Sequence, residues 1–120
     1  NEIPIVPMSE VVEKGVDECT RFIFDRASRD TETIYCSWDT DSIDHSCMPG
    51  TSCPESYGLK SREALQIARI AGEYDVGVFE LAELSPVFDT SQISTKLACN
   101  LIYHYLGSRA RALRARGETP

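Results

Sequence analysis

Two acidic side chains follow an apolar segment of this chain and stand one residue apart. Asp39 and Asp41 come directly after the β-rich run 33–38. If that run is a strand, its side chains alternate between faces, so both carboxylates project to one side at its carboxyl end. Two carboxylates held that close repel each other. A cation between them would stabilise the pair, and so would a shared proton that raises one pKa.

A long loop comes next and could carry the rest of a site. Residues 42–58 contain a Pro-Gly pair, a further Pro and a closing Gly. Loops of this length inside compact α/β units are usually functional. Asp44 is more typical of a turn residue than of a direct ligand, so we expect it, with His45, to lie around the ligands. The cysteines of the loop lack the tight pair spacing of a zinc site.

Hydrophobic periodicity indicates alternating strands and helices around these residues. Strands are predicted at 3–6, 33–38 and 75–81, and helices at 9–23, 61–71 and 90–106, the last ended by Gly107. Such alternation is typical of an α/β fold with a parallel sheet, in which ligands bind at the carboxyl ends of strands. Asp39, Asp41 and Glu83 would all lie there. Three parallel strands are few, so we expect part of a larger sheet.

Composition narrows the class of protein. The 120 residues are 42% hydrophobic, which fits one globular unit. A net charge of -7 argues against nucleic acid as a partner, and no apolar run is long enough to span a membrane. The arginines Arg109, Arg111, Arg114 and Arg116 are interpreted as a solvated last helical turn. Five cysteines suit reduced thiols better than paired ones, which indicates a cytoplasmic protein.

The order and spacing of several motifs resemble one enzyme family. The segments are Ser37-Trp38-Asp39-Thr40-Asp41-Ser42-Ile43-Asp44, Pro49-Gly50-Thr51, Gly58-Leu59, Ser61-Arg62-Glu63-Ala64-Leu65 and Leu81-Ala82-Glu83-Leu84-Ser85-Pro86. Together they resemble the C-terminal part of the ureohydrolases, which include arginase, agmatinase, guanidinobutyrase and formimidoylglutamase. Residues 1–120 would then be the C-terminal portion of a single ureohydrolase domain.

The resemblance implies a three-layer α/β/α fold and a centre of two metal ions, usually Mn²⁺, with Ni²⁺ or another divalent ion as alternatives. Metal-bound hydroxide would cleave a guanidino C–N bond, releasing urea and an amine. Asp39 is similar to the metal-bridging aspartate of the family, Asp41 to an aspartate that chelates one ion, and Glu83 to the glutamate that binds the cationic amidine. Independently, hard oxygen ligands suit ions such as Mn²⁺.

The chain departs from the family in ways that leave alternatives open. Thr40 and Ser42 are more polar than the aliphatic residues typical there, and the Gly-Asp-His and Asp-x-His-x-Asp motifs that supply further ligands are absent from these residues. We therefore expect an upstream segment or a second chain to complete the site. The alternatives are a formimidoylglutamase that releases formamide, and a non-catalytic subunit or fragment with this fold. Homo-oligomers, trimers or hexamers, are implied by the resemblance alone.

Overall fold

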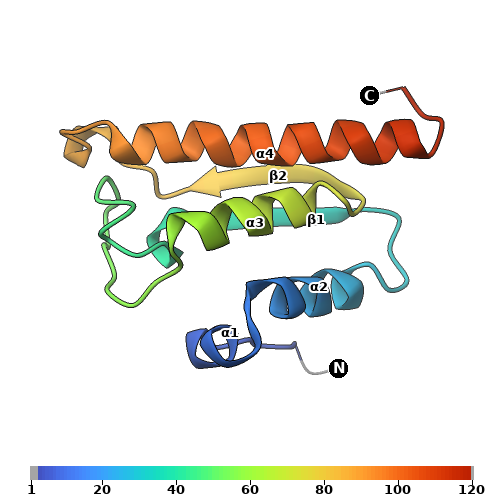
Figure 1. Cartoon of the computed structure of the whole chain (residues 1–120), viewed down its shortest axis with the longest axis horizontal. Helices are drawn as coiled ribbons and strands as arrows, with labels where there is room; N and C mark the ends of the chain where they lie inside the picture. The colour runs from blue at the N-terminus through green and yellow to red at the C-terminus, as the bar shows by residue number, and fades with distance from the viewer. Residues whose placement is uncertain (1–2, 120) are drawn as a thin grey trace.

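The computed structural model describes residues 3–119 and shows an α/β unit (Figure 1). Its elements in chain order are α1 Met8–Lys14, α2 Val16–Ala27, β1 Ile34–Asp39, η1 Thr40–Ser42, α3 Ser61–Ala71, β2 Val76–Ala82, η2 Pro86–Phe88 and α4 Ile93–Ala115. The two strands pair in parallel. The predicted helices and the second and third predicted strands are thus present, with shifted boundaries.

The first predicted strand is wrong. Residues 3–6 take no strand structure, and Ile3 and Ile5 are largely exposed. Pro4 and Pro7 explain the failure, because proline lacks the N–H that a sheet ladder uses. Within residues 3–119 the sheet therefore has two strands rather than three.

The first helix is divided at Gly15. The apolar spacing of Val12, Val16 and Cys19 predicts one helix, but Gly15 has φ 87° and ψ 151°, a conformation open in practice only to glycine. As a result α1 and α2 leave Gly15 in different directions (Figure 1). Val12 is exposed on α1, whereas Val16 and Cys19 are buried on α2.

The strands have one buried face. Tyr35 pairs with Val78 and Asp39 with Ala82, and an irregularity next to Ile34 shifts the pairing by one residue. Val76 is consequently buried while Val78 is half exposed, although strict alternation predicts that they share a face. On the open face Tyr35 donates a hydrogen bond to Glu80, which lowers the pKa of that carboxyl group.

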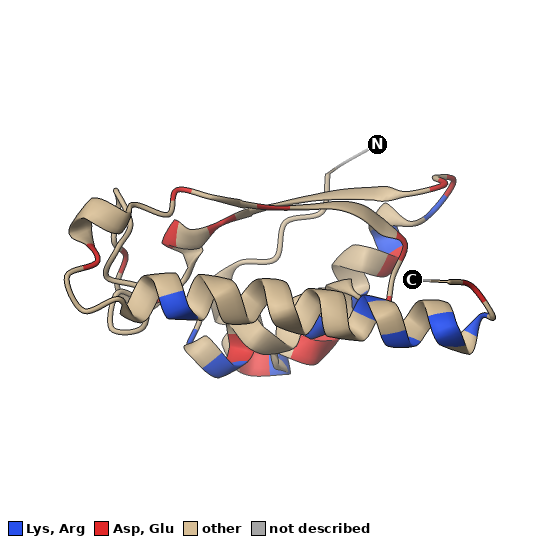
Figure 2. Ribbon diagram, turned by 90° about the horizontal axis from the view of Figure 1, so that it is seen from above, with Lys and Arg blue, Asp and Glu red and all other residues tan. Residues whose placement is uncertain are grey.

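The core lies between the sheet and the helices, all on one side of the strands (Figure 2). Phe79 of β2 packs edge-on against Trp38 of β1, and its ring stacks on Tyr105 of α4 at 4.5 Å between centroids. The Tyr105 hydroxyl donates to the Val76 carbonyl at 2.7 Å. The main buried residues are Phe24, Ile34, Trp38, Ile43, Met48, Ala64, Ala68, Ile70, Ala71, Val76, Leu97, Leu101 and Tyr105.

The last helix is longer than predicted. α4 continues through Gly107 to Ala115. Contacts beyond the glycine offset its cost of about 1 kcal/mol, because Arg109 and Arg116 both form ion pairs with Asp75 at 2.9 Å. The interpretation of the arginines as a purely solvated turn is therefore wrong for these two, and their guanidinium groups lower the pKa of Asp75.

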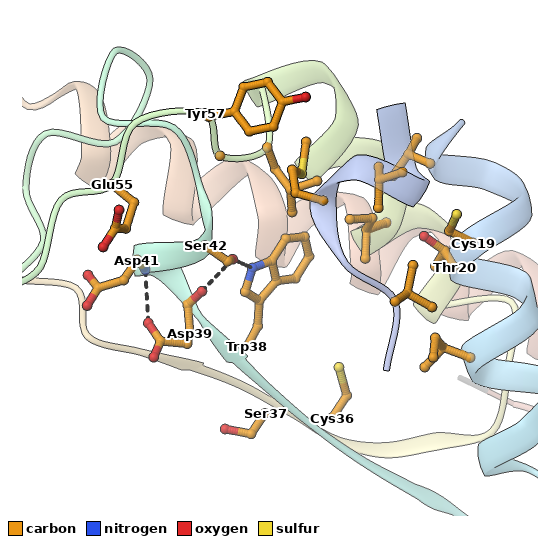
Figure 3. Close-up of a pocket in the computed structure, with 18 of the residues that line it drawn as sticks. Cys19, Thr20, Cys36, Ser37, Trp38, Asp39, Asp41, Ser42, Glu55 and Tyr57 are labelled. Atoms are coloured by element: carbon orange, nitrogen blue, oxygen red, sulfur yellow. Dashed lines mark hydrogen bonds between the residues drawn. The ribbon is translucent and has the colours of Figure 1, made fainter. Parts of the chain in front are cut away.

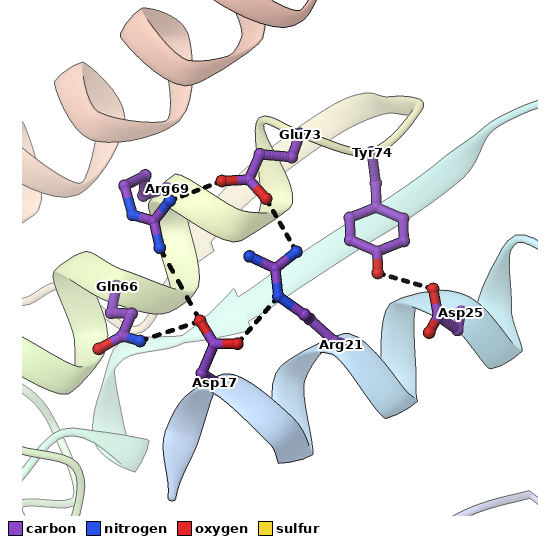
Figure 4. Close-up of polar contacts among 7 residues, drawn as sticks. All are labelled: Asp17, Arg21, Asp25, Gln66, Arg69, Glu73 and Tyr74. Atoms are coloured by element: carbon purple, nitrogen blue, oxygen red, sulfur yellow. Dashed lines mark hydrogen bonds and ion pairs between the residues drawn. The ribbon is translucent and has the colours of Figure 1, made fainter.

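An ionic network joins α2 to α3 (Figure 4). Arg21 donates to Asp17 on its own helix at 2.9 Å and to Glu73 at 2.8 Å, and Glu73 also accepts from Arg69 at 2.6 Å. Gln66 donates to Asp17 at 3.1 Å, which with Arg21 lowers the pKa of Asp17. The network holds α2 beside α3. Among the helices of residues 3–119, we find none with the length and apolar character needed to cross a membrane.

Candidate functional site

The two aspartates lie where β1 ends and the chain turns into η1 (Figure 3). Trp38, whose ring is buried in the core, donates through Nε1 to the Ser42 hydroxyl at 3.0 Å. Ser42 in turn donates to the Asp39 carbonyl at 2.7 Å. Because the Trp38 ring is packed in the core, these hydrogen bonds hold the turn in a fixed position relative to the core.

A backbone turn, rather than strand alternation, sets how the two aspartates lie relative to each other. Asp39 is exposed at the last position of β1, and its Oδ1 accepts the backbone N–H of Asp41 at 2.9 Å. Asp41 is half-buried in η1. The prediction that both project from one strand is wrong, because the strand ends at Asp39. That the two carboxylates form one site stays a prediction.

One carboxylate oxygen of this pair has no hydrogen-bond partner. Oδ1 of Asp41 is buried and unpaired within residues 3–119. A buried carboxylate oxygen without a donor is costly, and a cation is one way to satisfy it. The residues present therefore fit a divalent ion that prefers hard oxygen ligands. No group of three or more His, Cys, Asp or Glu side chains suited to a metal forms among the described residues.

A hollow of about 840 Å³ opens beside the aspartates. Asp39, Asp41 and Glu55 line it, and Figure 3 shows their carboxylates away from its apolar wall. That wall includes Val6, Met8, Val11, Val16, Ile23, Phe24, Cys36, Trp38, Leu59 and Ile67. The pair thus lies at the acidic end of a mainly apolar hollow.

The end of β2 approaches the same corner. Thr40 is fully buried and its hydroxyl donates to the Ala82 carbonyl at 2.8 Å. Glu83 follows Ala82 with φ 62°, a left-handed conformation that is uncommon outside glycine. Its Oε2 accepts a hydrogen bond from Ser52 at 2.9 Å. Glu83 lies at the predicted edge of the sheet but does not line the hollow.

Asp44 organises the loop. Its Oδ1 accepts from the backbone and hydroxyl of Ser46, and its Oδ2 accepts from Lys60 at 2.8 Å and from the N–H of Tyr57 at 3.1 Å. The ammonium of Lys60, with the Ser46 bonds, holds the pKa of Asp44 well below its usual range. His45 is exposed, and its backbone N–H donates to the Glu55 carbonyl at 2.8 Å. Their predicted place around the ligands stays a prediction.

Asp89 anchors the last helix to the loop. Its buried carboxylate accepts the N–H groups of Ser94 at 3.1 Å and Thr95 at 2.8 Å, two of the free donors in the first turn of α4. The Ser94 hydroxyl accepts the N–H of Gly50 at 2.7 Å. A Cβ on Gly50 would lie 2.6 Å from that of Asp89, so only glycine fits this contact. The Pro-Gly turn of the loop is thereby held against α4.

Three polar residues of this region were missed by sequence reasoning. Glu55 lines the hollow, Ser52 holds Glu83, and Thr40 binds the end of β2. Each acts through a contact between residues far apart in sequence. The one signal in the sequence was that Thr40 is more polar than the aliphatic residue typical of the resembled family at this position.

Comparisons with known proteins agree on a class. The model of the Arginase family matches residues 1–107. Proclavaminate amidinohydrolase of Streptomyces clavuligerus is 32% identical over 107 residues, which cover 86% of this chain and 34% of that protein. Guanidinobutyrase of Pseudomonas aeruginosa is 38% identical over 73 residues, which cover 61% of this chain and 23% of that protein.

Solved structures give the same result. Trypanosoma cruzi formiminoglutamase, crystallised in its oxidized form with Mn²⁺, superposes with a TM-score of 0.77 at 32% identity. The alignment covers 85% of this chain and 34% of that one. The chain therefore has an α/β fold with arginase-like architecture.

The chain belongs to the arginase family. It spans about a third or less of the length of the curated relatives reported above.

Proposed function

We propose that this chain is the C-terminal portion of a metal-dependent amidine hydrolase that acts on small guanidino compounds. The observation that carries the proposal is the pair Asp39 and Asp41, with a buried unpaired oxygen on Asp41, at the carboxyl end of a parallel strand. Relatives named guanidinobutyrase and proclavaminate amidinohydrolase support the guanidino side.

Asp39 and Asp41 would hold the divalent ions. Two Mn²⁺ ions are the proposed cofactor, with Ni²⁺ as an alternative, and when bound they lower the pKa of water from about 16 toward neutrality. Asp39 accepts the Asp41 N–H through Oδ1, and its Oδ2, which has no hydrogen bond within residues 3–119, would face a metal ion. Because these two residues provide few ligands, we propose that an upstream segment or a second chain supplies the others.

Glu83 would bind the substrate. A guanidinium is planar and positively charged, so a carboxylate both orients it and balances its charge. The Ser52 hydroxyl occupies one oxygen of Glu83 and leaves the other for the substrate. In the overall reaction one water adds to the guanidinium carbon, the C–N bond to the alkyl nitrogen breaks, and urea and a protonated amine are released.

A formimino substrate is the second candidate. The likeness to a formiminoglutamase structure at 32% identity favours it specifically. The same arrangement would then release formamide rather than urea. For either substrate we propose a cytoplasmic homo-oligomer, and the five free cysteines fit a reducing compartment.

A substrate panel tests the function. Full-length protein is loaded with Mn²⁺ or Ni²⁺ and incubated with 4-guanidinobutyrate, agmatine, arginine and formiminoglutamate, and urea and formamide are measured. We expect urea from at least one guanidino compound and no product after metal chelation. Formamide alone would replace the leading substrate class, and no product from any compound by metal-loaded protein would refute the hydrolase.

A further inference from the structure

One buried hydroxyl connects the two halves of the candidate site. Thr40 stands between Asp39 and Asp41 and is 0% exposed. Its Oγ1 donates to the backbone carbonyl of Ala82 at 2.8 Å. This hydrogen bond joins the turn that carries Asp39 and Asp41 to the last residue of β2. The turn is therefore linked to β2 by a side chain as well as by the backbone pairing of the strands.

The far end of that bond lies next to Glu83. Ala82 is the register partner of Asp39 and directly precedes Glu83. Glu83 has a positive φ, and its exposed carboxylate accepts a hydrogen bond from Ser52. Because Glu83 directly follows Ala82, a shift of the Ala82 carbonyl would also shift the backbone that carries Glu83 relative to the aspartates.

We propose that Thr40 is a positioning residue that sets the spacing between the aspartate pair and Glu83. This inference rests on the proposed function, because it assigns those carboxylates to metal and substrate. A valine at this position would fill the same volume but would remove the donor to Ala82. Displacements of about 1 Å at a catalytic group can lower a rate about 100-fold, so one hydroxyl is enough to matter.

The test uses full-length protein with Mn²⁺ and compares Thr40→Val with Thr40→Ser. We expect Thr40→Val to lower kcat at least tenfold with a smaller change in KM, and to weaken Mn²⁺ binding about tenfold in calorimetry. Thr40→Ser keeps the hydroxyl and should recover most of both. The matched control is Ser108→Ala, which removes a buried hydroxyl of α4 beside Gly72; it should change neither quantity.

The outcomes separate this inference from the proposed function. Values of kcat and Mn²⁺ affinity within twofold of the wild type in Thr40→Val, or equal losses in Ser108→Ala, would overturn the positioning role. If the wild type releases no product, the proposed hydrolase function is refuted, and the Mn²⁺ titration alone tests the positioning role of Thr40. Weaker Mn²⁺ binding in Thr40→Val with recovery in Thr40→Ser would support that role. Unchanged Mn²⁺ binding in Thr40→Val would refute it. If Thr40→Val does not fold, Thr40→Ala takes its place.

Discussion

At the scale of single residues, the candidate site consists of carboxylates that differ in what already binds them. Both oxygens of Asp44 are occupied by Lys60, Ser46 and Tyr57. Asp41, by contrast, keeps a buried oxygen with no partner among the described residues. A carboxylate whose oxygens are already bonded serves structure, whereas one that lacks a partner is available to a ligand. Hydrogen bonding thus separates two aspartates that the sequence presents as similar.

Glu83 should govern substrate affinity. Glu83→Gln keeps the shape of the side chain and the acceptor for Ser52 but removes the charge. A hydrogen bond to a charged group contributes about 1.5–3 kcal/mol, so KM for a guanidino substrate should rise about 10- to 100-fold in steady-state assays. Glu80→Gln, on the same strand and bonded to Tyr35, is the control. Equal KM values for both variants and the wild type would exclude Glu83 from the substrate site.

Asp44 should make stability depend on pH. Its pKa is lowered in the fold, so its contribution is fully present above the ordinary value of about 4 and is lost as the pH falls below that value toward the folded pKa. Asp44→Asn should therefore be less stable than the wild type at pH 7, and its stability should fall less below about pH 4.

Urea unfolding between about pH 2 and pH 7 measures this effect. Lys60→Met should reproduce part of it, because Lys60 is the main cause of the shift. Parallel curves for Asp44→Asn and the wild type across the acid range would show that the Asp44 bonds contribute nothing to folding.

At the scale of elements, the loop of residues 42–60 combines a strained backbone conformation at Tyr57 with hydrogen bonds to the buried carboxylate of Asp44. Tyr57 has φ 68° and is 65% exposed, so its ring gains little for the strain of its backbone. The N–H of this residue nevertheless donates to Asp44. The left-handed backbone conformation of Tyr57 therefore places its N–H within hydrogen-bond distance of the Asp44 carboxylate.

Tyr57→Gly should stabilise the protein. Glycine adopts positive φ without the penalty of about 1–2 kcal/mol and retains the N–H bond. Its greater unfolded-state entropy costs about 0.5–1 kcal/mol, so the free energy of unfolding should rise by about 0.5–1 kcal/mol. Chemical denaturation measures the change. Tyr57→Ala, which removes the ring but keeps the strain, should give no gain, and a destabilised glycine variant would contradict the account.

Local patterns predicted the helices and the two observed strands because periodic apolar residues are enough to specify each of them. They failed where distant contacts decide. Gly107 predicts a helix end, yet Arg109 and Arg116 reach Asp75 and extend α4 past it. Likewise the sequence places Asp39 and Asp41 close together, but the Ser52 bond to Glu83 joins residues 31 positions apart, and no local signal encodes it.

At the scale of the whole molecule, two strands carry a single layer of helices and leave their other face open. Tyr35 and Val78 on that face are more than half exposed. The stability of residues 3–119 must therefore come mainly from the core between the sheet, α3 and α4. Leu101, fully buried on α4, belongs to that core, while its neighbour Ile102 is 42% exposed.

Leu101→Ala should consequently cost about 2–5 kcal/mol, because it removes buried methyl groups and leaves a cavity. Ile102→Ala removes a similar side chain one position away and should cost less than half as much. Thermal and urea unfolding of the two variants compare the costs. A larger loss from Ile102→Ala would mean that α4 buries its other face.

Metal binding and turnover in one variant test the central claim most directly. Full-length wild-type protein and Asp41→Asn are titrated with Mn²⁺, and urea release is measured at each ratio, with the exposed Asp30→Asn as a charge-matched control. The wild type and Asp30→Asn should bind Mn²⁺ and release urea in proportion to bound metal. Asp41→Asn should lose at least about 100-fold in urea release together with Mn²⁺ affinity. Unchanged Mn²⁺ binding and unchanged urea release in Asp41→Asn would contradict the assignment of a metal centre to this corner.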